Sequence, residues 1–505
     1  MDLILRKNSI QYVFYLIFIL GLQFYLSAKD SFISDSLAKA FQIETVKSSS
    51  HTIHYPAKSI DPEFNYHPVT FLIKNKGELK SVFSETFAFL YGKIFYFFPT
   101  KTMIYFNGIF LLLSIFILNT FGKIKVQISA IVFSTSVILT QVIDLSEVPI
   151  TILLGSISYT IWAKAILEEN LLYFSLSVFL SICLSFFRLE FLILSCLIYS
   201  LSIPLIYKMK QKKGIMIFSF FFLIPILYFL FWNYKEYGHP FGIRYLYNFT
   251  ADHYFAKENR FYNLIKILFT GLPEKGFKFG LFFISPYFVY VLIKYRSFLF
   301  SFKQLQPLHY HLTVFIVYPI MIAISAPNDG ITITARYALF TMIPGIFIIS
   351  QFWEKLKKDK VFISFIVFSI FVNLLILKVS KESFKMIRKI NQLYENFNAD
   401  LWVFYDQNIS ETAGLKLVNQ PSISFGNFSD PIRTTNLFKR MEDNKIKSIY
   451  IFDFSKVVPN AYMNLKREVE LNSDNFFKLF RNNKYTCGAY TEVQFIGYRK
   501  CDLNL

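Results

Sequence analysis

The chain has 505 residues, of which 54% are apolar, 19% aromatic and only 17% charged, and its mean hydropathy is +0.41. A soluble globular protein is usually about 25% charged, so the composition excludes an ordinary soluble domain and predicts a polytopic membrane protein. The formal net charge is +19, but most basic residues of the first 380 lie in short loops between apolar runs. We expect them to set the topology and contact anionic lipid, and we expect no nucleic-acid partner.

Eleven apolar runs predict membrane-spanning helices. The first, residues 10–28, follows two basic residues and is interpreted as an uncleaved signal anchor, because its end fits the small-x-small cleavage rule poorly. Each run is close to the roughly 20 residues that a helix needs to cross the hydrocarbon. The other ten runs lie at residues 103–121, 125–143, 149–166, 170–187, 190–207, 214–233, 279–296, 308–326, 336–353 and 361–379.

Residues 82–98 are aromatic and apolar, but three polar residues interrupt them, so they either span the membrane or lie in its interface. The positive-inside rule favours the interface. Without a span there, the basic loops at 208–213 and 354–360 fall in the cytoplasm. The amino terminus is then predicted inside and the carboxyl terminus outside, with interfacial helices in the first outer loop, residues 29–100.

This topology gathers the polar groups at the outer face, in the first outer loop, in the long outer loop of residues 234–278, and in short turns. A transporter more often carries ionisable groups in mid-membrane, whereas these spans are nearly pure apolar. The outer groups are Asp30, Asp35, Asp144, Glu147, Arg188, Glu190, Arg244, Asp329 and Arg336.

The polar segment 381–505 predicts a small α/β domain on the outer side, following a transmembrane domain at 1–380. Residues 401–405 and 448–452 predict buried strands, 434–444 a helix, and 492–498 an edge or terminal strand. Cys487 and Cys501 flank a predicted hairpin. They can form a disulfide if the domain lies outside the cytoplasm.

No Gly-rich phosphate loop, paired CxxC or HExxH occurs in the sequence, so the candidates for chemistry are outer-face acids and arginines. Asp35 begins a segment with helical character just after the first span, and Lys39 follows one turn on. A carboxylate there can accept a proton from an acceptor hydroxyl. The alternative role for Asp35 is a helix cap.

Arg336 ends the stretch that begins at Asp329 and leads into a span, where it either binds a lipid-borne phosphate or anchors the interface. Arg244 in the long outer loop, and Lys39, are further phosphate-binding candidates. Asp144 and Glu147 occupy an outer turn, where they cap the turn, steer an acceptor or bind a divalent cation. Asp329 is a third acid of this kind.

The order of these features resembles the GT-C glycosyltransferases, in the bacterial branch akin to dolichyl-phosphate-mannose mannosyltransferases and the aminoarabinose transferase of lipid A. Ser34-Asp35 falls where that family commonly has Gly-Asp followed by a helix. Ala335-Arg336-Tyr337 resembles a stretch that ends in Pro-Arg-Tyr, with Ala335 in place of the proline. Weaker landmarks are Asp61-Pro62, Phe98-Pro99, Gly238–Gly242 and Gly280–Pro286.

The resemblance implies an inverting hexosyl- or pentosyltransferase of the bacterial inner membrane. Asp35 would deprotonate an acceptor hydroxyl, which would attack a sugar carried on polyprenyl phosphate. Arg336, with Arg244 or a divalent cation, would stabilise the leaving phosphate. The acceptor would be a lipid, glycan or protein, positioned by the outer α/β domain. The alternatives are a lipid-linked glycan flippase and an O-antigen-type polymerase or ligase.

Overall fold

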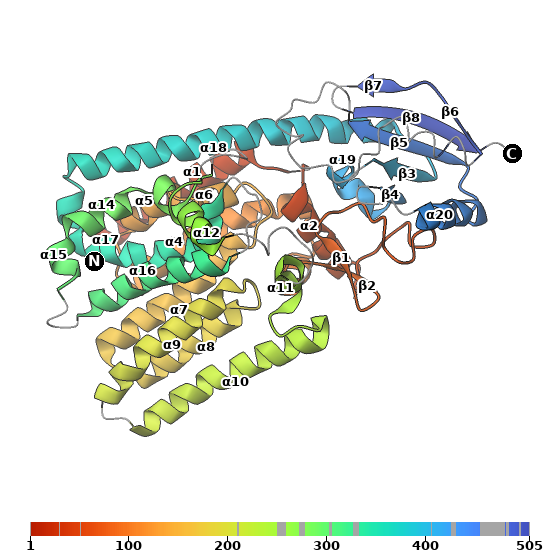
Figure 1. Cartoon of the computed structure of the whole chain (residues 1–505). Helices are drawn as coiled ribbons and strands as arrows, with labels where there is room; N and C mark the ends of the chain where they lie inside the picture. Colours follow the sequence, from red (N-terminus) through yellow and green to blue (C-terminus); the bar gives the residue numbers. More distant parts are fainter. Residues whose placement is uncertain are drawn as a thin grey trace. The chain divides into compact units, whose positions relative to one another are not determined.

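The chain forms two compact units in the computed structural model, Met1–Ser27 with Met103–Ser380, and Ala28–Thr102 with Lys381–Leu505 (Figure 1). The sequence-based division placed residues 29–100 with the transmembrane domain, whereas the structure packs them with the carboxyl-terminal segment. The structure describes residues 2–503 except 30, 51, 210–211, 250–258, 272–277, 302–305, 327–332, 406, 426–430, 455–479, 481–483 and 494–495.

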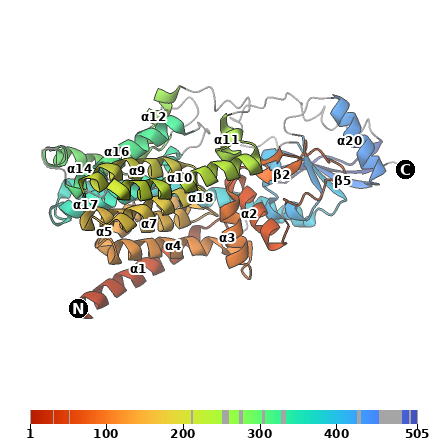
Figure 2. The same ribbon diagram turned by 90° about the horizontal axis from the view of Figure 1, so that it is seen from below.

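The first unit is a bundle of helices (Figure 2). Within it, α7 packs against α4 and α8, and α16 packs against α9, α12 and α17. Its helices are α1 (Asp2–Leu26), α4 (Ile104–Thr120), α5 (Val126–Ser134), α6 (Ile138–Gln141), α7 (Val148–Glu168), α8 (Leu171–Leu184), α9 (Glu190–Lys208), α10 (Lys212–Tyr237), α11 (Gly242–Phe249), α12 (Arg260–Leu268), α13 (Leu281–Ile284), α14 (Tyr287–Lys294), α15 (Arg296–Leu299), α16 (Pro307–Ser325), η3 (Thr334–Thr341), α17 (Met342–Leu356) and α18 (Lys360–Leu393).

Eight helical segments in the described part of the chain are long and apolar enough to cross a membrane, by length and composition. They correspond to eight of the predicted runs and support a multi-pass membrane protein, but the count of eleven spans is not confirmed. The run at 170–187 becomes α8, which has only 14 residues. The last span does not stop near residue 379, because α18 continues to Leu393 and into the second unit.

Two predicted spans are broken helices. The run at 125–143 divides into α5 and α6 at a Ser-Thr-Ser sequence, where the Thr135 hydroxyl donates to the Ile131 carbonyl at 2.7 Å. Such side-chain bonds compete with helical ones. The run at 279–296 divides into α13 and α14 at Pro286, which lacks an N–H and forces Ser285 out of helical geometry, with φ −126° and ψ 61°.

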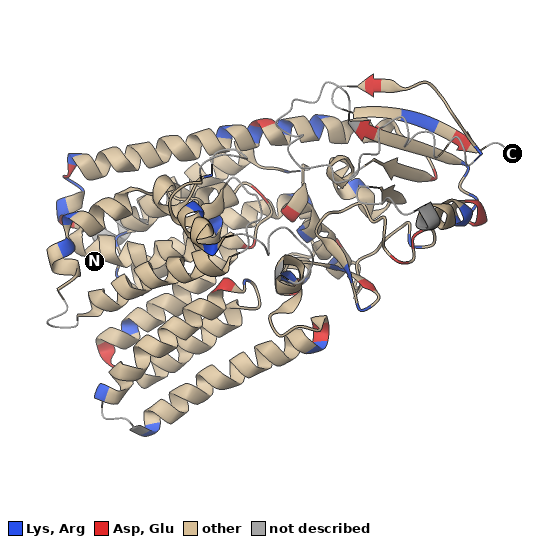
Figure 3. Ribbon diagram, in the orientation of Figure 1, with Lys and Arg blue, Asp and Glu red and all other residues tan. Residues whose placement is uncertain are grey.

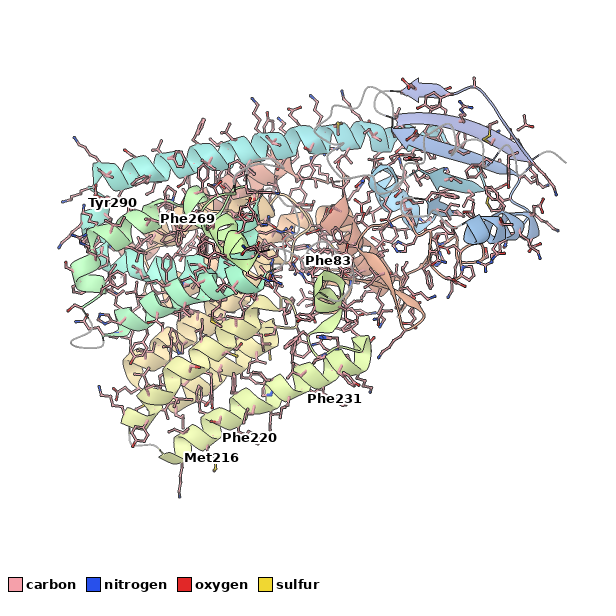
Figure 4. All side chains as sticks on the ribbon, viewed as in Figure 1. Phe83, Met216, Phe220, Phe231, Phe269 and Tyr290 are labelled. Carbon is pink, nitrogen blue, oxygen red and sulfur yellow. A yellow bond between two sulfur atoms is a disulfide. The ribbon has the colours of Figure 1, made fainter. Side chains whose placement is uncertain are left out.

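Helix α10 shows the apolar outer surface expected of a membrane bundle. Met216, Phe220 and Phe231 project away from its axis (Figure 4), and they are 73%, 62% and 63% exposed. An apolar surface of this extent is unusual on a soluble monomer and suits contact with lipid chains.

Charged residues of this unit concentrate at the ends of its helices (Figure 3). Loops that the topology predicts on the cytoplasmic side meet one another, since Lys125 pairs with Glu354 and Lys294 pairs with Asp359. The bundle therefore brings together loops that the sequence assigns to one membrane side.

The second unit contains a six-stranded mixed sheet of order β4-β3-β5-β8-β6, with β7 also paired to β8. Strand β3 lies parallel to both β4 and β5, while β8 runs antiparallel to β5, β6 and β7. Its elements are β3 (Leu401–Phe404), α19 (Gln407–Glu411), η5 (Gly414–Val418), β4 (Ser422–Ser424), α20 (Pro431–Asp443), β5 (Ser448–Phe454), β6 (Tyr485–Cys487), β7 (Thr491–Val493) and β8 (Ile496–Leu503), preceded by η4 (Tyr394–Asn396).

The predicted buried strands β3 and β5 and the predicted helix α20 are confirmed. The prediction of an edge or terminal strand at 492–498 is confirmed in part, because among the described strands β7 pairs only with β8, and β8 is the last strand along the chain. That segment divides into β7 and β8, and β8 lies between β5 and β6. An interior position suits β8, since Ile496 and Cys501 are only 2% and 0% exposed.

The first outer loop contributes α2 (Ser34–Lys47), the β1–β2 hairpin (Leu72–Asn75 and Glu78–Ser81), α3 (Glu85–Ile94) and η1 (Thr100–Thr102). Lys76 and Gly77 form the hairpin turn with φ of 50° and 80°, as a two-residue type I′ turn requires. With ten residues, α3 is too short to span a membrane. Its interfacial placement stays a prediction.

Cys487 and Cys501 are joined by a disulfide between directly opposed positions of β6 and β8. The bridge closes a loop with a sequence separation of 14, so its loss is expected to lower the free energy of unfolding of the sheet domain by about 2–3 kcal/mol. Thermal unfolding of the Cys487→Ser/Cys501→Ser variant measures this. Reductant should destabilise the wild type and a Cys183→Ser control equally, and insensitivity of the wild type to reductant would exclude the bridge.

Candidate functional site

Helix α2 carries Asp35 in its first turn, with the side chain half-buried. A carboxylate at this position is stabilised by the positive end of the helix dipole. Lys39 follows one turn later on the same face of α2. It is only 5% exposed, and its Nζ lies 4.6 Å from the centre of the Phe83 ring. The predicted general base, Asp35, and the predicted phosphate-binding residue Lys39 therefore share one side of the helix.

The structure adds a second acid, Glu411, at the end of α19. Its carboxylate accepts hydrogen bonds from the backbone N–H of Ser34 at 2.9 Å and of Thr70 at 3.1 Å. Burial raises the pKa of Glu411 above its ordinary value of 4.5; the bonds from Thr70 and Ser34 lower it, and the negative charge of Asp35 raises it again. The two carboxyl groups, far apart in the sequence, therefore lie close enough to interact electrostatically.

Helix α19 reaches the first outer loop through hydrogen bonds besides those of Glu411. The Gln407 amide donates to the His67 carbonyl at 3.1 Å, and the Ser410 hydroxyl donates to the Pro68 carbonyl. Burial lowers the pKa of His67 to about 4, so its ring is neutral at pH 7 and a proton-transfer role there is not favoured. Because α19 follows β3 directly, the sheet fixes the position of Glu411.

Ser34 occupies the position where the resembled family commonly has glycine, and its φ is +53°, in the left-handed region. Glycine adopts this region without the steric penalty of a Cβ. We expect Ser34→Gly to raise the free energy of unfolding by up to about 1 kcal/mol. Amide hydrogen exchange in α2 measures the change.

Ser36→Gly is the matched control for that substitution. The Ser36 hydroxyl donates to the Ile33 carbonyl at 2.9 Å and accepts from the Ile33 N–H at 3.3 Å. Its replacement should destabilise the start of α2 by about 1 kcal/mol or more. Equal signs for the two substitutions would contradict the assigned backbone.

The Asp61-Pro62 landmark is a structural turn. Asp61 is 1% exposed and accepts hydrogen bonds from the Tyr55 hydroxyl at 3.1 Å and from the N–H groups of Asn65 and Tyr66 at 3.0 and 2.8 Å. Burial raises the pKa of Asp61, although these bonds lower it. The residue stabilises the loop and has no solvent-facing carboxylate to offer.

In the helical unit, Glu147 pairs with Arg188, whose guanidinium also binds Glu190. The N–O distances are 3.4 and 2.8 Å, and the Glu147 and Arg188 side chains are each 8% exposed. Arg244, on α11, lies close enough to Glu190 to interact with it electrostatically. Four predicted outer-face groups thus form one cluster, and loss of one partner would leave a buried charge uncompensated.

Asp144 caps its own turn, accepting from the Leu145 N–H at 2.8 Å. Arg336 is half-buried at the start of η3, with its guanidinium 5.4 Å from the centre of the Tyr337 ring. The preceding Ala335 donates its N–H to the Phe279 carbonyl at 3.1 Å. Proline has no N–H to donate, which explains why alanine suits this chain at the position where the resembled family has proline.

Two predicted acids, Asp30 and Asp329, lie outside the described residues. Across the residues with described positions, no group of three or more His, Cys, Asp or Glu side chains is arranged to hold a metal ion. Glu147 is already bound by a guanidinium, which disfavours a cation beside it. A divalent cation at Asp144 and Glu147 stays an untested prediction.

No protein-family model matches the sequence, and no curated protein matches it. The chain is similar to the structure of the Archaeoglobus fulgidus oligosaccharyltransferase in the apo form, and to that of the archaeal oligosaccharyltransferase AglB from the same organism in complex with an inhibitory peptide and a dolichol-phosphate. Each comparison gives 10% identity and a TM-score of 0.45, and covers 88% of this chain and 69% of the other. At this identity and TM-score the comparison carries no argument about the activity, which is therefore inferred from the residues of this chain.

Sequence reasoning missed Glu411. It ends α19, the short helix that follows the carboxyl end of a correctly predicted buried strand, and α/β domains commonly place ligand-binding residues at that edge of the sheet. An acid at that point was the one available signal. Its partner on α2 is more than 370 residues away in the sequence, so spacing alone could not pair the two.

Proposed function

We propose that the protein is a membrane glycosyltransferase that moves a sugar from a polyprenyl-phosphate carrier to an extracytoplasmic lipid, glycan or protein by an inverting mechanism. The observation that carries the proposal is the acid pair at the start of α2, where Asp35 is half-buried next to the buried Glu411. A polytopic bundle with a polar, acid-bearing loop unit fits chemistry on a lipid-borne substrate.

Asp35 acts as the general base in this mechanism. It takes the proton of the acceptor hydroxyl while the oxygen forms a bond to the anomeric carbon. The bond between that carbon and the phosphate oxygen breaks, and its electron pair leaves on polyprenyl phosphate. Phosphate is a competent leaving group, so the step needs charge stabilisation more than an acid.

Glu411 acts as a positioning residue. Its two backbone hydrogen bonds tie Ser34 and Thr70 together and fix the first turn of α2, which carries Asp35. Burial raises the pKa of Glu411, and the nearby charge of Asp35 raises it further, so the two carboxyl groups influence each other.

Arg336, Arg244 and Lys39 are the proposed groups for the phosphate. Arginine presents a planar fork of N–H donors that matches phosphate oxygens. The half-buried Arg336 keeps its guanidinium beside an aromatic ring, and Arg244 balances the acids of the Glu147–Arg188–Glu190 cluster. A divalent cation, if one is used, would add Lewis-acid stabilisation of the phosphate.

The active side is proposed to be extracytoplasmic, in a bacterial inner membrane with the amino terminus inside. The disulfide between Cys487 and Cys501 supports an oxidising compartment for the sheet domain. Two ion pairs, Lys125–Glu354 and Lys294–Asp359, join the basic loops to one another. They support the placement of these loops on one side of the membrane, the cytoplasmic side.

A reporter fusion after Ser380 tests this orientation. A reporter active only in the periplasm should work there, while a fusion within the loop at residues 355–360 should be active only with a cytoplasmic reporter. The opposite pattern would reverse the topology and remove the proposed site from the outer face.

The flippase alternative is separated from the transferase by the product. A transferase releases polyprenyl phosphate and gives a glycoside of inverted anomeric configuration, whereas a flippase returns the lipid-linked sugar intact. Incubation of the purified protein in lipid nanodiscs with polyprenyl-phosphate sugars and an envelope extract, followed by mass spectrometry and NMR, distinguishes the two. Intact donor on the opposite leaflet, with no glycoside, would favour the flippase.

A further inference from the structure

A cavity of about 410 Å³ lies in the first outer loop between the second half of α2, strand β2 and helix α3. Its volume falls within the range of about 300–1,000 Å³ typical of small-molecule sites. Helices α2 and α3 pack closely beside it, since a Cβ on Gly92 would meet the Val46 side chain at 2.7 Å. The walls of the cavity are therefore the closely packed helices α2 and α3 together with strand β2.

Gln42 is the unusual polar group of this cavity. Its side chain is 5% exposed, and its Nε2 donates to the Phe83 carbonyl at 3.1 Å. Its Oε1 is buried and has no hydrogen-bond partner among the residues with described positions. An unsatisfied buried acceptor costs about 1–3 kcal/mol, so a donor supplied by a ligand would be stabilising there.

The rest of the lining is both polar and apolar. Glu85 supplies a carboxylate acceptor, Lys80 and Lys93 supply donors, and Phe89 supplies an aromatic face that is 60% exposed. Lys80 Nζ lies 4.0 Å from the Glu85 carboxylate, so these two charges largely balance. The site suits a ligand with many hydroxyls and an apolar face more than a strongly charged one.

The cavity lies on the same face of α2 as Asp35. Asp35, Lys39, Gln42 and Val46 are spaced by four, three and four residues, which aligns them along one helical face. Two turns separate Asp35 from Gln42, a distance of about 10 Å along the axis. Phe83 links the two regions, because Lys39 lies over its ring and Gln42 binds its carbonyl.

We propose that this α2–α3 cavity binds the saccharide part of the acceptor, leaving the reacting hydroxyl to reach Asp35 two helical turns away. The assignment of the saccharide as the acceptor rests on the proposed transfer reaction. The binding of a saccharide in the cavity does not depend on it. Saccharide hydroxyls donate to Gln42 Oε1 and Glu85 and accept from Lys93, and the C–H face of a sugar ring packs on Phe89.

Saturation-transfer-difference NMR on the full-length protein in lipid nanodiscs tests the proposal, with maltose, lactose and N,N′-diacetylchitobiose as probes. At least one disaccharide should bind the wild type. Gln42→Leu should weaken its binding about tenfold by loss of the amide. Glu85→Ala should weaken it by a similar factor, and this side chain is exposed enough that folding is retained.

Gln420→Leu is the matched control, because the Gln420 amide also donates to a backbone carbonyl, that of Ala399 at 3.1 Å, but does not line the cavity. Its saccharide binding should equal that of the wild type. Absence of any disaccharide signal, or wild-type binding by both Gln42→Leu and Glu85→Ala, would overturn the proposal. Displacement of the sugar by inorganic phosphate would assign the cavity to an anionic headgroup and also overturn it.

Asp35→Asn separates this inference from the proposed function. It should bind the disaccharide like the wild type and yet transfer sugar about 10²- to 10⁴-fold more slowly. If the variant transfers sugar normally, the assignment of the base fails while the cavity stands. If transfer is lost but the wild type binds no disaccharide, only the cavity assignment fails.

Discussion

Replacing Asp35 by Asn is expected to reduce sugar transfer by about 10²- to 10⁴-fold, the usual contribution of a positioned general base. Asparagine keeps the shape of the side chain and its place in the first turn of α2 but cannot take a proton at neutral pH. Insertion and thermal unfolding should change little, because the aspartate is only half-buried. Release of polyprenyl phosphate from a labelled donor measures the rate.

Glu63→Gln is the control for that substitution. Glu63 is an exposed acid of the same outer loop, and its carboxylate accepts a hydrogen bond from the Asn65 amide at 3.1 Å. The same loss of negative charge should leave transfer at the wild-type rate. Transfer by Asp35→Asn within tenfold of the wild type would exclude Asp35 as the base.

Replacing Glu411 by Ala is expected to destabilise the second unit by about 1–3 kcal/mol, because the N–H groups of Ser34 and Thr70 lose their acceptor. Transfer should fall by up to about 100-fold through misplacement of Asp35. Hydrogen exchange should rise at those two amides in particular. Glu411→Gln keeps one acceptor oxygen and should recover part of both losses, which a purely electrostatic role would not predict.

The pH dependence of stability offers a second test of Glu411. Because its pKa is raised above 4.5 on folding, the folded protein holds this proton more tightly than the unfolded chain does. The stability contributed by the group is therefore complete below about pH 4.5 and is lost as the pH rises through the folded pKa. Unfolding of wild type and Glu411→Gln across this range should show that the variant lacks this decline. Parallel curves would contradict the raised pKa.

The length and the flanks of apolar runs were sufficient to predict much of the fold. The eight long helices and strands β3 and β5 follow from runs of the right length and burial pattern. The helix breaks at Thr135 and Pro286 were missed because hydropathy does not register backbone competition by hydroxyls or a missing N–H.

Long-range pairing was the part that the sequence could not supply. In the order β4-β3-β5-β8-β6, the last strand of the chain, β8, lies between β5 and β6, which both precede it in the sequence. Local sequence patterns do not encode such an insertion. Likewise, Asp35 was predicted from its place after the first span, but Glu411 reaches it only through the packing of α19 on residues 67–70. Arg188 pairs with Glu147, which lies 41 residues away, and spacing could not predict that pair either.

The lipid pool of cells that lack the protein tests the central claim most directly. We predict that these cells accumulate one polyprenyl-phosphate sugar and lose the same sugar from one envelope glycan, lipid or protein. The wild-type gene should reverse both changes, and the Asp35→Asn variant, present at equal amount in the membrane, should reverse neither. Unchanged pools of both donor and product, or full complementation by Asp35→Asn, would contradict the proposed transferase and its base.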